Sequence, residues 1–164
     1  MSMGMDYEAA RDVATRFLAY RARTRREVED RLRRGGFSGQ VIDEVIEILL
    51  KYNYINDGAF AADYAEELLR VKGYGRRRIK YELFRRGVPE NIISDALRPF
   101  DEDDELEAAI KRLEYKYGDR RPSSVQQCLQ YLLRRGVSLH AANAAMKQMG
   151  YIGSNLETDM PDSP

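Results

Sequence analysis

The sequence CLQYLLRRGVS at residues 128–138 has a pattern that occurs twice earlier in the chain. VEDRLRRGGFS fills residues 28–38, and IKYELFRRGVP fills residues 79–89. In each copy an apolar residue is followed four positions later by Leu and eight positions later by Gly. The glycines of the three copies lie 51 and 49 residues apart, which predicts three tandem repeats of about fifty residues.

The pattern within each copy predicts a helix, a tight turn and a second helix. Apolar residues at positions i and i+4 lie on one face of a helix. Glycine adopts the left-handed conformation that commonly ends a helix without steric cost. The residue two positions after each glycine is a good helix starter, as an N-cap or a first-turn residue. These starters are Ser38, Pro89 and Ser138.

A further helix is predicted before each copy. Apolar residues recur there at helical spacing. They are Ala9, Val13 and Phe17, then Phe60, Tyr64 and Leu68, then Leu106, Ile110 and Leu113. Thr24 with Glu27 has the spacing of a capping box. Asp57 is expected to cap the helix that begins near Gly58, and Pro122 is expected near the start of another helix.

The predicted fold is therefore all-α, with three tandem three-helix repeats that form an elongated, curved array. The repeats are predicted to occupy residues 6–55, 56–100 and 101–152. Residues 153–164 are acidic, polar and contain proline, so a disordered tail is expected there.

Composition excludes several classes of protein. Of the 164 residues, 43% are hydrophobic and 33% are charged, and the net charge is zero. The single cysteine, Cys128, excludes an internal disulfide and a four-cysteine zinc site. The N-terminal sequence lacks the apolar core of a signal peptide, and the apolar runs are too short to span a bilayer. A cytoplasmic protein that is not inserted in a membrane is expected.

Residues with catalytic potential are few. Cys128 takes the repeat position of Val28 and Ile79, which predicts a core residue. His140, the only histidine, is expected on the surface just inside a helix start. The acidic run at residues 101–105 lacks the spacing of a calcium loop and fits the first turn of a helix better. We therefore predict no catalytic residue, no metal, no cofactor and no enzymatic activity.

Charge alternates in blocks along the chain. Residues 21–37 carry seven basic and three acidic side chains, whereas residues 38–69 carry one basic and seven acidic. Residues 70–88 carry eight basic and one acidic, and residues 89–107 carry one basic and eight acidic. The zero net charge therefore conceals strongly basic segments, which are candidates for contact with a polyanion.

The basic segments differ in how well they are neutralised locally. In the first repeat, acidic residues stand four positions before basic ones, which favours helix surface pairs and a structural interpretation. Those pairs are Glu27–Arg31, Glu29–Arg33 and Asp30–Arg34. Arg134 and Arg135 stand at the end of a predicted helix, where the helix dipole already favours cations.

The basic residues of the second repeat have almost no acidic neighbour within a helical turn, except for the pair Glu82–Arg86. They are the strongest candidates for contact with nucleic acid or an acidic protein, unless the acidic segment 101–107 neutralises them. Tyr74 and Tyr81 could add stacking, although such tyrosines are more often half-buried packing residues. The predicted binding residues are Arg76, Arg77, Arg78, Lys80, Arg85 and Arg86, with Arg25, Arg26, Arg33 and Arg34 from the first repeat.

Several stretches resemble the RecX family of regulatory proteins. They are RTRREVEDRL at residues 23–32, NYINDGAFA at residues 53–61, GYGRRRIKYEL at residues 73–83, and RGV at residues 135–137. The similarity extends over residues 7–150. It implies an all-helical modulator of the RecA recombinase that binds in the groove of the RecA–DNA filament and inhibits ATP hydrolysis and strand exchange. The implied setting is DNA repair, recombination and the SOS response, with a RecA-type recombinase and its single- or double-stranded DNA as partners of a monomer.

Two other functions are compatible with three-helix units. A helix-turn-helix protein that reads DNA sequence has similar units, but the last helix of the first two repeats is apolar and acidic, at residues 40–50 and 90–97. Acidic side chains on a recognition helix would be repelled by phosphates. A helical scaffold for protein partners would use the same exposed helices without DNA.

Overall fold

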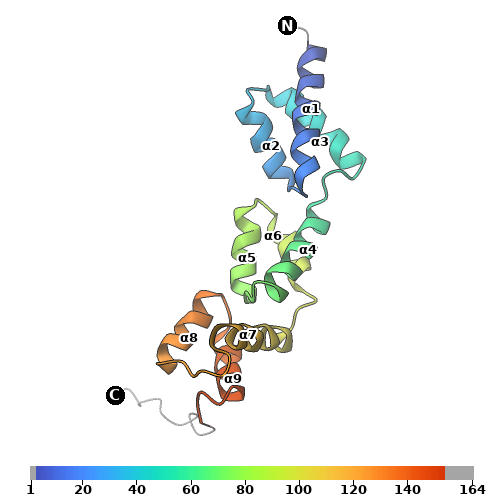
Figure 1. Ribbon diagram of the computed structural model, residues 1–164. Coiled ribbons are helices and arrows are strands. Elements are labelled where there is room, and N and C mark those ends of the chain that lie inside the picture. Colours follow the sequence, from blue (N-terminus) through green and yellow to red (C-terminus); the bar gives the residue numbers. More distant parts are fainter. Residues whose placement is uncertain (1–2, 154–164) are drawn as a thin grey trace, which may run out of the picture. The chain divides into compact units, whose positions relative to one another are not determined.

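A computed structural model describes residues 3–153, and these residues form helices with no strand (Figure 1). The all-α class and the tandem three-helix repeats are confirmed. The helices are α1 (Met3–Tyr20), α2 (Arg25–Arg34), α3 (Gly39–Lys51), α4 (Asp57–Arg70), α5 (Arg76–Arg85), α6 (Glu90–Leu97), α7 (Glu102–Tyr117), α8 (Val125–Arg134) and α9 (Leu139–Gln148).

The middle helix of each repeat ends in the predicted glycine turn. Gly36, Gly87 and Gly136 have φ angles of 83°, 77° and 79°, in the left-handed region. In each case the residue after the glycine donates its N–H to the carbonyl of the leucine four positions before the glycine, at 3.4, 3.2 and 3.2 Å. This 6→1 hydrogen bond, together with a 5→2 bond from the glycine, defines the Schellman motif.

Most of the predicted helix starts are confirmed. Thr24 forms a full capping box with Glu27 at the start of α2. Ser38 and Ser138 cap α3 and α9 through their side chains. Asp101, the N-cap of α7, forms a capping box with Asp104, and the acidic residues that follow it stabilise the first turn of that helix.

The predicted cap of α4 was wrong by one residue. The side chain of Asn56, not that of Asp57, accepts the N–H of Ala59 at 2.9 Å. Asp57 instead accepts the backbone N–H of Arg25 at 2.8 Å and so connects the first turn of α4 to the first turn of α2. Sequence reasoning could not separate these two residues, because Asn and Asp are equally good caps.

The residues at i and i+4 of the repeat pattern are buried, as predicted. Their side chains have no exposed surface, and they are Val28, Leu32, Ile79, Leu83, Cys128 and Leu132. The prediction for α1 needs a correction, because Ala9 is exposed and Ala10 and Ala14 are buried. The small alanines allow α1 to pack closely against α2 and α3, with Val13 and Phe17 at the edge of the core.

Two compact units make up the described chain. The first contains the residues up to Ala65 together with Glu82–Leu97, and the second contains Glu66–Tyr81 together with the residues from Arg98 onwards. Helices α4 and α5 each contribute to both units, so the second repeat is shared between them. The repeat boundaries after residues 55 and 100 stay predictions, and the predicted tail lies outside the described residues from residue 154 onwards.

Within residues 3–153, none of the helices combines the length and the apolar character needed to cross a bilayer.

Candidate nucleic-acid interface

Each compact unit contains one junction in which the glycine turn of one repeat packs on the start of the middle helix of the repeat before it. In the first unit, the buried Thr24 donates its hydroxyl to the carbonyl of Arg86 at 2.7 Å. In the second unit, the N–H of Gly75 donates to the carbonyl of Arg135 at 2.9 Å. Thr24 and Gly75 stand at equivalent positions of the repeat, as do Arg86 and Arg135.

The close approach at these junctions requires glycine in the turn. A Cβ atom on Gly136 would collide with the backbone of Arg78, and one on Gly87 would collide with the side chain of Arg26. Gly36, the turn glycine of the first repeat, has open space at the same position. The turn glycine therefore serves helix termination in all three repeats and packing between repeats in two of them.

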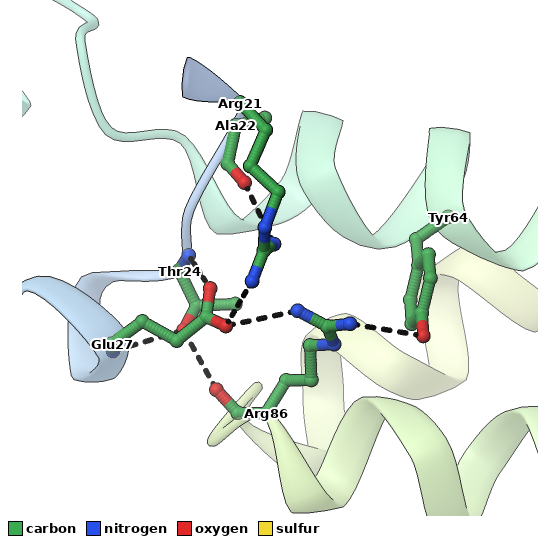
Figure 2. A network of polar contacts seen from close by, with 6 residues as sticks. All are labelled: Arg21, Ala22, Thr24, Glu27, Tyr64 and Arg86. Atoms are coloured by element: carbon green, nitrogen blue, oxygen red, sulfur yellow. Dashed lines mark hydrogen bonds and ion pairs between the residues drawn. The ribbon is translucent and has the colours of Figure 1, made fainter. Parts of the chain in front are cut away.

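Arg86, one of the predicted binding residues, belongs to the interior of the first junction (Figure 2). Its guanidinium donates to Glu27 at 2.9 Å and to the hydroxyl of Tyr64 at 3.3 Å. Glu27 also accepts from Arg21 at 3.1 Å and from the backbone N–H of Thr24 at 3.0 Å. Burial alone would lower the pKa of Arg86, but its bonds with Tyr64 and Glu27 raise that pKa above its ordinary value.

The predicted binding residues of the first repeat are paired on their own helix, α2. Arg25 contacts Glu29 at 2.6 Å, and Arg26 and Arg33 contact Asp30 at 3.9 and 2.8 Å. Arg34 donates to the carbonyl of Asp30 at 3.1 Å. The pairs differ from those predicted, because Glu27 is used by Arg86 and Arg21 and the remaining acids pair within α2. The structural interpretation of this segment is favoured.

At the start of α5, the acidic segment supplies a partner for the backbone. Glu105 is buried, and its carboxylate accepts the N–H of Arg76 at 3.0 Å. The guanidinium of Arg76 donates to the carbonyl of Phe100. Glu105 thus caps α5 from α7 and places negative charge at the positive end of the α5 dipole. Arg76 is half-buried in this contact.

Farther along α5, basic and aromatic side chains lie around a hollow of about 340 Å³ beside the α8–α9 turn. We call it the turn hollow, and it is lined by Arg77, Arg78, Tyr81, Leu133, Arg134 and Gly136. Among these lining residues there are three arginines, one tyrosine and no acid. Such a surface suits a polyanion, because each phosphate can meet a guanidinium and a base can stack on an exposed ring.

The arginines of the turn hollow come from helices that are far apart in sequence. Arg77 donates to the carbonyl of Leu133 at 2.8 Å, which ties α5 to the end of α8. Arg78 lies over the rings of Tyr74 and Tyr81, at 5.4 and 5.5 Å from their centroids. These contacts hold the guanidinium planes in place before any ligand binds.

Sequence reasoning identified Arg77 and Arg78 but not their neighbour Arg134. Arg134 is exposed, and its position at a helix end suggested only a dipole contact. The repeat period was the available signal, since the α8–α9 turn is equivalent to the α5–α6 turn. Lys80 and Arg85 are also exposed on α5, but they do not line the turn hollow.

The last helices of the first two repeats, α3 and α6, do not have the surface of a DNA-reading helix. In α3, one face is buried through Val41, Val45 and Leu49. The exposed residues on the other side include Asp43, Glu44 and Glu47. Phosphates next to a groove would repel these carboxylates, which disfavours sequence reading by α3.

The chain matches family models and known proteins. Residues 10–49 match the first three-helix domain of RecX, and residues 56–97 match the second three-helix domain of RecX. The regulatory protein RecX of Chlorobium phaeobacteroides is 31% identical over 145 residues, which cover 88% of this chain and 95% of that protein. RecX of Prosthecochloris aestuarii is 35% identical over 116 residues, which cover 70% of this chain and 77% of that protein.

Some relatives are longer than this chain. RecX of Bacillus licheniformis is 30% identical over 152 residues, but the match covers only 58% of that protein. Among solved structures, RecX from Lactobacillus salivarius has a TM-score of 0.78 at 27% identity, and the match covers 92% of this chain and all of that one.

Proposed function

Because this chain belongs to the RecX family of regulatory proteins, we propose that it regulates a RecA-type recombinase by binding the recombinase–DNA filament. The proposed effect is inhibition of ATP hydrolysis and strand exchange in DNA repair and recombination. The protein acts by binding, without catalysis of its own, as a cytoplasmic monomer. Its partners are the recombinase and the single- or double-stranded DNA within the filament.

The turn hollow is the observation that supports a role at a nucleoprotein filament. Three arginines from α5 and α8 converge there without an acidic lining residue, and Tyr81 is 51% exposed beside them. A filament offers both phosphates and acidic protein surface to such a site. Arg77, Arg78 and Arg134 are the residues that we assign to this contact.

Binding to adjacent recombinase subunits would oppose their relative movement. ATP turnover and strand exchange require subunits of the filament to move, and a ligand that binds one arrangement more tightly shifts the equilibrium towards it. The rigid three-helix repeats suit this role, because side chains on packed helices lose little further freedom on binding.

The test is DNA-stimulated ATP hydrolysis by the recombinase while the protein is added at substoichiometric ratios. We expect the rate of hydrolysis to fall at ratios well below one molecule of this protein per recombinase subunit. The double variant Arg77→Glu with Arg134→Glu is expected to lose most of this inhibition. Arg11→Glu with Arg16→Glu, which changes two exposed arginines of α1 by the same charge, serves as the matched control.

Hydrolysis that stays constant up to saturation would refute the proposal. Equal inhibition by the turn-hollow variant and the control would leave regulation in place but remove the turn hollow from it. A helix-turn-helix DNA reader would instead show sequence-selective binding to free duplex DNA, and a scaffold would bind protein partners without DNA.

A further inference from the structure

A second hollow in the second unit lies near the end of α4 and is lined in part by the turn residue Arg135. It has a volume of about 500 Å³. The residues around it are Arg70, Val71, Lys72, Gly73, Tyr74, Ala108, Lys111, Arg112, Tyr115 and Arg135. Five of these ten side chains are cationic, two are tyrosines and none is acidic. We call this site the phosphate hollow.

The inner cations of the phosphate hollow have neutral partners. Arg112 donates to the hydroxyl of Tyr131 at 2.6 Å and lies 5.0 Å from the ring centroid of Tyr115. Arg135 donates to the carbonyls of Lys72 and Gly73 and lies over the ring of Tyr74 at 4.8 Å. Hydroxyls, carbonyls and ring faces orient a guanidinium but do not cancel its charge, so the interior keeps a positive potential.

The cations at the rim take part in ion pairs that are mostly exposed, although Arg70 also lies 3.9 Å from the partly buried carboxylate of Asp104. Arg70 pairs with Glu66 at 3.1 Å, and Lys111 pairs with Glu107 at 2.5 Å. All four side chains are more than half exposed. Exposed pairs of this kind contribute little to stability, so an incoming phosphate can displace these carboxylates easily.

At the bottom of this hollow, the backbone of Gly73 packs closely against α7. Gly73 has a φ of 63°, and a Cβ atom there would lie 3.2 Å from the Cβ of Arg112. Any larger residue would fill the space between the end of α4 and the face of α7. At the rim, the ring of Tyr115 is 81% exposed and stands next to the cationic interior.

From these features we propose that the phosphate hollow binds consecutive phosphates of a polynucleotide or of a nucleoside polyphosphate, with Tyr115 available to stack on the base. Lys72, Lys111, Arg112 and Arg135 supply the charge, and the exposed ring of Tyr115 supplies a surface on which a base can stack. Recognition of this kind depends on phosphate and not on base identity.

Packing alone does not explain the site. Arg112 and Arg135 have structural contacts, but Lys72 is exposed at the same hollow, and the carboxylates that pair with Arg70 and Lys111 are not among the lining residues. Burial lowers the pKa of Arg135, and the nearby cations Arg112 and Arg78 lower it further. This crowding of positive charge costs stability in the free protein, and a bound polyanion would relieve it.

The experiment is a binding titration of the full chain without recombinase. The probes are a fluorescein-labelled oligothymidylate, inorganic tripolyphosphate, a peptide nucleic acid of the same base sequence, and polyglutamate. The variant is Lys72→Glu with Lys111→Glu. The control is Lys51→Glu with Lys147→Glu, which changes two exposed lysines on α3 and α9 in the same way.

We expect oligothymidylate affinity to fall by about tenfold or more in the hollow variant and by less than about twofold in the control. The slope of log affinity against log salt should fall by about one for each lost phosphate contact. Tyr115→Ala is expected to weaken the oligonucleotide but not tripolyphosphate. Should the double variant melt early, Lys72→Ala with Lys111→Ala replaces it, with an expected loss in the same direction.

The probes separate the sources of phosphate. Competition between tripolyphosphate and the oligonucleotide would support one shared site, and binding of only one of them would assign the site to that source. Equal binding of the peptide nucleic acid or of polyglutamate would overturn the proposal, since neither carries phosphate. Equal loss in the hollow and control variants would also overturn it. Because no recombinase is present, these outcomes are independent of the ATP-hydrolysis test.

Discussion

The two junctions between repeats have the same backbone contact and opposite electrostatics. At the first, Arg86 meets the carboxylate of Glu27 and the hydroxyl of Tyr64. At the second, the equivalent Arg135 meets carbonyl groups and tyrosine rings, and the position of Glu27 is taken by Arg78. The first junction therefore joins an arginine to a carboxylate, whereas the arginine of the second meets only neutral groups in the contacts described above.

This difference explains why the repeat pattern alone does not identify the binding residues. Equivalent arginines have a structural role in one unit and line a cationic hollow in the other. What separates them is the sign of one neighbour, Glu27 or Arg78, which the pattern of apolar residues and glycines does not specify. Substitutions at the turn glycines, at the Thr24 cap, at the two equivalent arginines and at Asp57 test how far the two junctions differ.

The largest effect is expected for Gly136→Ala. The new Cβ atom would collide with the backbone of Arg78, which cannot move aside as a flexible side chain can. We expect the free energy of unfolding to fall by more than about 3 kcal/mol in urea denaturation. Gly36→Ala is the control, because it has the same positive φ but open space, and it should cost about 1–2 kcal/mol. Equal losses would show that the second junction contributes nothing to stability.

The next effect is expected at the cap of the first junction. Thr24→Val removes the acceptor for the N–H of Glu27 and the donor to the carbonyl of Arg86. Losing a cap and leaving a carbonyl without its partner should together cost about 2–3 kcal/mol. Ser38→Ala, which removes a cap that is exposed and makes no contact between repeats, should cost about 1 kcal/mol. A Thr24 loss no greater than that of Ser38 would contradict the role of the threonine hydroxyl in the junction.

A smaller difference in the loss of stability is expected between substitutions of the two equivalent arginines, Arg86 and Arg135. Arg86→Met leaves the carboxylate of Glu27, whose side chain is 20% exposed, without its partner from the α5–α6 turn, and should cost about 2 kcal/mol. Arg135→Met removes bonds to two neutral carbonyls and relieves crowded positive charge, and should cost about 1 kcal/mol or less. Thermal denaturation of the two variants side by side measures the difference. The reverse order would show that the second junction depends on its arginine more than the first.

The smallest effect concerns pH and Asp57, which joins α4 to α2 at the first junction. Burial raises the pKa of Asp57, although the bond from the N–H of Arg25 opposes this shift. A raised pKa in the folded state means that the stability contributed by this group is present below its unfolded pKa and lost as pH rises through its folded pKa. The difference in unfolding free energy between wild type and Asp57→Asn should therefore change as pH rises from the ordinary aspartate pKa of about 4, and become constant once Asp57 is ionised in the folded state. A difference that is flat across the whole range would refute the shift.

Much of the fold was predictable from sequence because it depends on local rules. Helix starts at Thr24, Ser38 and Ser138 follow from hydroxyl side chains before apolar periodicity, and all three are caps in the structure. The Gly136 turn and the burial of Cys128 follow from repeat equivalence. The misassigned cap at Asp57 and the misplaced core residue in α1 are errors of one position, within regular elements that were correctly identified.

The binding surface was only partly predictable. Arg77 and Arg78 were among the predicted residues, but Arg134 and every cation of the phosphate hollow were missed. Lys111 and Arg112 belong to a segment whose local charge is mixed, and Lys72 stands at the edge of the basic segment 70–88, outside the residues predicted to bind. Packing of α7 and the α8–α9 turn around the end of α4 brings them together, over sequence separations that no window of residues covers.

By itself, the sequence determined the all-α class, the three repeats, the glycine turns and the family to which the chain belongs. These properties follow from periodicity, capping and left-handed glycine, each of which acts over a few residues. Only the tertiary structure decided which charges are neutralised and which remain available. Arg86 and Arg135 have the same place in the repeat, and their roles differ because the net field at a guanidinium depends on every charge packed around it, including those from distant helices.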